Sequence, residues 1–126
     1  MVLKRVAVAA VLFCTVTLHA QFQTVVIQPV KARSPSGTIQ DPNGDPVEGA
    51  KVQLVDCPIG RSYPSEPHKV LAEMRSDRRG NFTVDARYFH APYCFHITAY
   101  GFDNLEVEVR TSRFAKPLYL KLVIAT

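Results

Sequence analysis

Residues 36–56 read SGTIQDPNGDPVEGAKVQLVD, in which two strand-like runs flank a turn rich in Gly, Pro, Asn and Asp. In the second run the apolar Val52 and Leu54 alternate with polar neighbours, which is the period-two pattern of a half-buried strand. Gly and Asn readily adopt positive φ, and Pro presets the first dihedral angle of a turn. The stretch therefore predicts two short strands joined through a tight turn at residues 42–46.

The same alternation recurs along the chain, whereas no segment after residue 35 places apolar residues at helical spacing over three turns. Strands with one apolar face cannot bury that face alone, so they are expected to pack sheet on sheet. We predict an all-β fold, a seven-stranded antiparallel β-sandwich, and a small open barrel is the alternative. The expected strands lie around Ile39 and at residues 50–55, 69–76, 82–85, 93–99, 105–110 and 118–124.

The N-terminus has the three-part plan of a secretory signal peptide at residues 1–20. Lys4 and Arg5 precede an apolar run at residues 6–16, and Ala20 ends the segment before a cleavage expected near Gln21. This run falls well short of the roughly 20 residues that a membrane-spanning helix needs, so a retained anchor is the lesser alternative. We expect an exported, periplasmic or extracellular protein without a membrane span in the mature chain, with an extended segment at 21–35 and one domain at 36–126.

Composition excludes few partners, but it argues against nucleic acid. The full chain carries a net charge of +4, and without Lys4 and Arg5 it keeps 13 basic against 11 acidic residues, a balance of +2. Nucleic-acid-binding proteins usually concentrate basic residues in one stripe, whereas those of this chain are scattered among acids and turns. We therefore expect no nucleic acid among its partners.

Cysteine usage fits export. Cys14 lies in the signal peptide, which leaves Cys57 and Cys94 in the mature chain. An even number of cysteines in an exported protein favours a disulfide over free thiols.

Four segments together resemble a known family: GTIQDPNGDPVEGAKVQLVD, RSDRRGNFTVDA, APYCFHITAYGF and NLEVEVR. They are similar to the carboxypeptidase regulatory-like domain, a transthyretin-like, immunoglobulin-like β-sandwich, over residues 36–124. One departure is Ala91-Pro92, where the family has Pro-Gly. The matching positions are Gly37, Asp41, Gly44, Pro46, Gly49, Ala50, Val52, Leu54, Ser76, Asp77, Gly80, Phe82, Pro92, Tyr93, Gly101 and Phe102.

The resemblance bears on the cysteines. In transthyretin-like sandwiches the second and fifth strands are antiparallel neighbours, which would bring Cys57, at the end of the second, beside Cys94, at the start of the fifth. If Val52, Leu54, Phe95 and Ile97 face the core, strand parity places both cysteines on the outer face. The resemblance thus implies a Cys57–Cys94 disulfide.

No catalytic residue, cofactor or metal site is predicted. In peptidases this module accompanies a much larger catalytic domain, so the resemblance implies no enzymatic activity. A transthyretin-like hydrolase of 5-hydroxyisourate is a remote alternative, because that family ends in Tyr-Arg-Gly-Ser whereas this chain ends at residues 123–126 in VIAT.

Two clusters imitate metal sites. His90 and His96 flank Cys94, but the cysteine is expected to be oxidised and His96 to be an outward strand residue. Residues 41–45 resemble the start of a calcium loop, but Pro46 stands where that loop needs Gly, which favours a turn stabilised by Asp and Asn side chains.

Binding residues are expected in loops, because a rigid sandwich leaves variation to its ends. The candidates are Arg61 and Tyr63 in the loop at 58–68, and Tyr88 and Phe89 in the segment at 87–90. We predict a non-catalytic module with an interaction or structural role toward an unidentified protein partner in the envelope or outside the cell. Because aromatic rings also stack on sugars, a carbohydrate-binding module acting on polysaccharide, similar to starch-binding domains, is the alternative.

Overall fold

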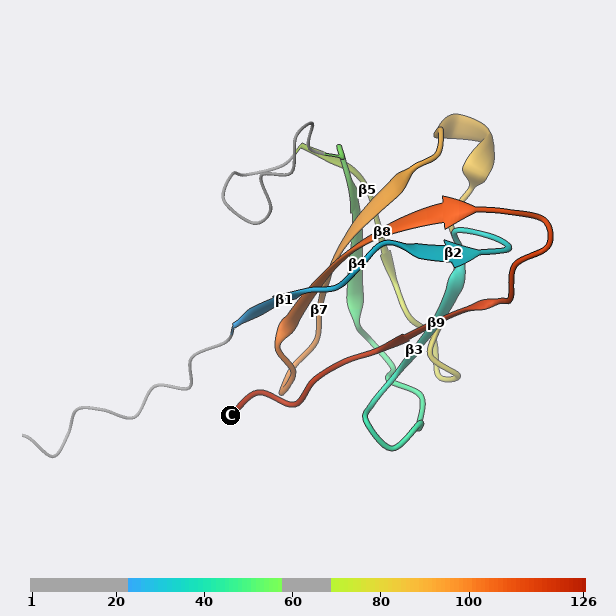
Figure 1. Cartoon of the computed structure of the whole chain (residues 1–126). Helices are drawn as coiled ribbons and strands as arrows, with labels where there is room; N and C mark the ends of the chain where they lie inside the picture. Colours follow the sequence, from blue (N-terminus) through green and yellow to red (C-terminus); the bar gives the residue numbers. More distant parts are fainter. Residues whose placement is uncertain (1–22, 58–68) are drawn as a thin grey trace, which may run out of the picture.

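The computed structural model describes residues 23–57 and 69–126, which form two β-sheets around one hydrophobic core (Figure 1). The larger sheet has the strand order β1-β8-β7-β4-β5, and β2 also pairs with β8. Its strands are β1 (Thr24–Val26), β2 (Val30–Ala32), β4 (Lys51–Val55), β5 (Val70–Arg75), β7 (Tyr93–Thr98) and β8 (Asn104–Thr111).

The smaller sheet has the order β6-β3-β9. It consists of β3 (Gly37–Gln40), β6 (Asn81–Phe82) and β9 (Leu118–Lys121). β3 runs antiparallel to β6 and parallel to β9. Gly37 of β3 is required by this packing, because a Cβ atom there would lie 2.8 Å from Cβ of Leu118.

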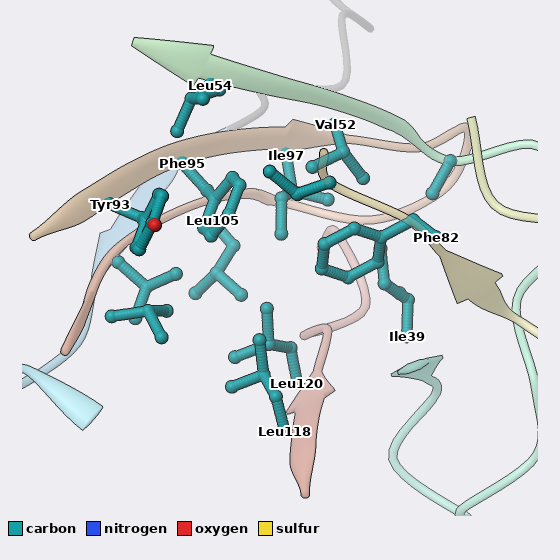
Figure 2. Packing of buried hydrophobic residues seen from close by; sticks show 14 of the residues in the cluster. Ile39, Val52, Leu54, Phe82, Tyr93, Phe95, Ile97, Leu105, Leu118 and Leu120 are labelled. Carbon is teal, nitrogen blue, oxygen red and sulfur yellow. The ribbon is translucent and has the colours of Figure 1, made fainter. Parts of the chain in front are cut away.

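The core lies between the sheets and takes its side chains from alternate positions of their strands (Figure 2). The rings of Phe82, from the smaller sheet, and Phe95, from the larger, meet edge to face with their centroids 5.7 Å apart. Such a pair adds about 1 kcal/mol beyond the burial of its apolar area. The fully buried residues of the core include Ile39, Val52, Leu54, Phe95, Ile97, Val107, Val109, Leu120 and Leu122.

The expected all-β architecture is confirmed, and two sheets that share one core are consistent with a β-sandwich. The expectation of seven strands, all antiparallel, is wrong. Among the described residues there are nine strands, and β1 and β2 add to β8 in parallel, as β9 does to β3. The segment at 21–35, which the sequence indicated to be extended without deciding whether it forms a strand, contributes both added strands, and they lie along successive parts of β8.

The Asp-x-x-Gly sequences at 41–44 and 77–80 form two turns with the same hydrogen bonds. Asp41 Oδ1 accepts from the backbone N–H groups of Asn43 and Asp45, at 2.8 and 2.9 Å. Asp77 Oδ1 accepts from those of Arg79 and Asn81, both at 2.9 Å. The favoured interpretation of 41–45 as a side-chain-stabilised turn is therefore confirmed.

A buried serine, Ser76, holds the backbone at Val47 and Ala50, just before β4. Ser76 Oγ accepts a hydrogen bond from the N–H of Ala50, at 2.9 Å, and donates one to the carbonyl of Val47, at 2.6 Å. The backbone N–H of Ser76 also donates a hydrogen bond to the carbonyl of Ala50, at 3.0 Å. These contacts satisfy polar groups that the sheet ladder leaves unpaired where β4 begins.

Two further observations complete the fold. The peptide bond between Ala91 and Pro92, where the sequence departs from the family pattern, is cis. Within the described ranges, no helix has the length and apolar character to cross a membrane.

Candidate functional site

A disulfide joins Cys57 to Cys94, with the two Cα atoms 5.2 Å apart. It forms at the end of β4 because Val55, two residues before Cys57, is the register partner of Cys94 on β7. The predicted antiparallel pairing of these strands and the predicted disulfide are both present. In the chain-entropy account, closing a loop with a sequence separation of 37 stabilises the fold by about 4 kcal/mol.

The disulfide borders a surface hollow of about 400 Å³, which we call the disulfide-end hollow. Its wall is largely apolar and aromatic, as is common in binding sites. Its lining includes Val55, Cys57, Leu71, Tyr88, Phe89 and Pro92.

Two of the four predicted loop residues, Tyr88 and Phe89, lie at this hollow. Tyr88 is 72% exposed, whereas Phe89 is half-buried and packs against the core. The other two, Arg61 and Tyr63, fall outside the described residues.

A short 3₁₀ turn (η2, Ala86–Tyr88) positions Tyr88. Asp85 caps the turn, and its carboxylate accepts hydrogen bonds from both Nε and Nη2 of Arg87, at 3.0 and 2.9 Å. The side-chain hydrogen bond from Arg87, with a second from its backbone N–H, lowers the pKa of Asp85, and the same side-chain pairing raises the pKa of Arg87. The Arg87 guanidinium carbon lies 5.6 Å from the centroid of the Tyr88 ring, so one ring face already has a cation near it.

The outer face of the larger sheet carries a row of polar side chains, of which His96 was predicted from the sequence as an outward residue. It runs over Glu73, Gln53, His96 and Glu106, which are register partners on β5, β4, β7 and β8. Gln53 Nε2 donates to Glu73 Oε1 at 3.2 Å, and His96 Nδ1 lies 3.0 Å from Glu106 Oε1.

Glu106 is the unexpected member of this row. In the sequence it alternates with the apolar Leu105 and Val107, which is the pattern of an outward residue, yet it is only 4% exposed. Within the described part of the chain, its Oε2 atom is buried without a hydrogen-bond partner. The antiparallel pairing of the fifth and sixth expected strands was the signal that could have placed it opposite His96.

The residues considered for metals are separate in the structure. The Cys94 sulfur is bonded to Cys57, His96 contacts Glu106, and His90 is an exposed residue at the disulfide-end hollow. Over residues 23–57 and 69–126, no three His, Cys, Asp or Glu side chains are grouped so that they could hold a metal ion.

No protein-family model matches the chain, and no curated protein matches it either.

Proposed function

We propose that this chain is a small exported β-sandwich module without catalytic activity, which binds a protein partner in the cell envelope or outside the cell. Export is supported by the Cys57–Cys94 disulfide, since disulfides persist in oxidising compartments. It is also supported by the signal-like sequence at residues 1–20.

A relationship to the carboxypeptidase regulatory-like domain is part of this proposal. Four glycines of the resemblance, Gly44, Gly49, Gly80 and Gly101, have φ between +79° and +91°, a region that favours glycine. The backbone conformation at these four positions therefore explains why glycine occurs there. The antiparallel pairing of β4 with β7 supports the relationship further.

The observation that carries the binding role is the continuity between the disulfide-end hollow and the edge of the larger sheet. β5 is the last strand of that sheet among the described residues. Its Leu71, 39% exposed, is also part of the hollow's wall, and the adjacent Val70 is 45% exposed.

This geometry suits one kind of occupant, an extended segment of a partner protein. Such a segment adds to the β5 edge through backbone hydrogen bonds, and it places an apolar side chain in the hollow beside Leu71 and Phe89. Backbone pairing supplies affinity, and the hollow supplies the choice of side chain.

The test is to capture a partner from envelope extract on immobilised protein, identify it, and measure its affinity for two variants. Leu71→Lys places a charge on the edge and in the hollow, so we expect at least about a tenfold loss of affinity. Phe114→Lys is the matched control, because Phe114 is 90% exposed and does not line this hollow. In the complex, amide hydrogen exchange of β5 should slow. An unchanged affinity of Leu71→Lys, or unchanged exchange in β5, would overturn the proposal.

The exposed Tyr88 favours carbohydrate binding as a second candidate. Since Arg87 lies over one face of its ring, a sugar would stack on the other face. Retention on polysaccharide columns that Tyr88→Ala abolishes and Leu71→Lys leaves intact would support this alternative over a protein partner.

A further inference from the structure

A second hollow, also of about 400 Å³, lies near the other end of the larger sheet. We call it the basic hollow, because its wall includes Lys51 and Arg75 and, among the described residues, no Asp or Glu. It shares no lining residue with the disulfide-end hollow, so it is a separate site. Its lining also includes Gly49, Thr98, Tyr100 and Asn104.

Lys51 and Arg75 stand directly opposite each other as register partners on β4 and β5. Like charges in this position destabilise a sheet. The ion pairs in the described part of the chain are Arg87–Asp85, His96–Glu106 and Arg110–Glu108, so none of them neutralises this pair. Two cations held side by side over a hollow are an arrangement that a bound anion would stabilise.

The acids of the neighbouring row are engaged elsewhere. Glu73 accepts a hydrogen bond from Gln53, and Glu106 contacts His96. Neither acid lines the basic hollow.

The side chains around the cations are suited to an oxyanion. Arg75 Nη1 donates to the carbonyl of Gly49 at 3.2 Å, which fixes the guanidinium beside the hollow and leaves most of its N–H groups for a ligand. Thr98, the register partner of Lys51 on β7, and Asn104, the first residue of β8, add hydroxyl and amide groups. A guanidinium binds carboxylate or phosphate through paired hydrogen bonds.

Tyr100 supplies an apolar surface at the same place. It is 99% exposed, so its ring has no protein cover within the described residues. Such a ring can pack against the body of a ligand whose charged group lies on Arg75 and Lys51.

We propose that the basic hollow binds a small ligand with an oxyanion, a carboxylate or phosphate group, held by Arg75 and Lys51 with the ligand body against Tyr100. This site goes beyond the proposed protein-binding role and does not depend on it.

The test titrates the isotope-labelled protein with three probes and follows backbone amide shifts by NMR. Inorganic phosphate presents the oxyanion alone, glucuronate presents a carboxylate on a ring, and glucose is the ring without charge. We expect phosphate and glucuronate to shift the amides of Lys51, Arg75 and Thr98, and glucose to leave them unchanged. Rising salt concentration should weaken both responses, because the contacts are exposed ion pairs.

Variants locate the site. Arg75→Gln and Lys51→Gln should each weaken phosphate binding about tenfold, and Lys121→Gln on β9 is the control that should leave it unchanged. Tyr100→Ala should weaken glucuronate but not phosphate. Lys51→Gln removes the repulsion between the cations at positions 51 and 75. The melting temperature of this variant should therefore equal or exceed that of the wild type. Absence of shifts with phosphate and glucuronate, equal shifts with glucose, or unchanged affinity in Arg75→Gln would each overturn the proposal.

Discussion

His96 and Glu106 face each other on β7 and β8, and the imidazole Nδ1 lies 3.0 Å from the carboxylate Oε1. The Glu106 side chain is 5% exposed and that of His96 is 26% exposed. In the tautomer that carries hydrogen on Nδ1, the imidazole donates this hydrogen bond to the carboxylate. This contact offsets part of the cost of removing the carboxylate from water, which is large for an unpaired buried charge.

Removing one partner of this pair should therefore cost more than removing both. We expect His96→Ala to lower the free energy of unfolding by about 1–3 kcal/mol, because the buried carboxylate loses its donor. The double variant His96→Val with Glu106→Val should be close to the wild type, since no buried charge remains. Urea unfolding measures both, and a double variant less stable than His96→Ala would contradict this account.

Substitutions at two glycines distinguish the cost of a strained backbone from the cost of a steric clash. Gly44 and Gly80 both have positive φ, but a Cβ atom at Gly44 meets nothing within 4 Å, whereas at Gly80 it lies 2.5 Å from the carbonyl oxygen of Ile39. We expect Gly44→Ala to cost about 1 kcal/mol, and Gly80→Ala at least about 2 kcal/mol more. Equal losses in the free energy of unfolding, measured by heat or urea, would contradict the close approach of Gly80 to β3.

The equivalent turns at Asp41 and Asp77 predict equivalent losses. Each carboxylate accepts two backbone hydrogen bonds at an exposed turn, so replacement by Ala should cost about 1 kcal/mol in either case. Because the side-chain oxygen of Asn can accept the same bonds, Asp41→Asn and Asp77→Asn should recover most of the stability. Chemical unfolding of the four variants is the check, and Asn variants as weak as the Ala variants would contradict it.

The disulfide should account for a large share of the stability. Replacing both Cys57 and Cys94 by Ser removes the closed loop, and we expect a loss of about 4 kcal/mol in the free energy of unfolding. Reduction of the wild type should produce a similar loss. A double variant within about 1 kcal/mol of the oxidised wild type would mean that the crosslink contributes little.

The positions of most strands could be predicted, because burial on one face leaves period-two alternation in the sequence. β4 lies within the predicted strand at 50–55, and β8 extends one residue beyond each end of the predicted strand at 105–110. β6 is only two residues long and β9 ends at Lys121, both shorter than expected. Alternation continues past the last ladder hydrogen bond, so it does not mark where pairing stops.

The direction of strand pairing and the burial of individual side chains could not be predicted in the same way. β1 and β2 have three residues each, and their partner β8 lies some eighty positions away, so no local signal announces the parallel contact. β1 also makes β8 an interior strand, and there Glu106 is buried although its parity assigns it to the outer face. Parity determines the face of a residue and not its accessibility.

Among the site residues, Tyr88 and Phe89 could be predicted because aromatic residues in a connecting segment are conspicuous. The basic hollow could not, since Lys51 and Arg75 are 24 positions apart and meet only through the register of β4 with β5.

Export and the Cys57–Cys94 disulfide are tested most directly by mass spectrometry of the protein isolated from its native compartment. We expect the mass of a chain without residues 1–20. That mass should be lower by two hydrogen atoms than the mass of the same chain after reduction, and Cys57 and Cys94 should occur in one crosslinked peptide. A full-length mass, or two cysteines that react with an alkylating reagent in the native protein, would contradict this expectation.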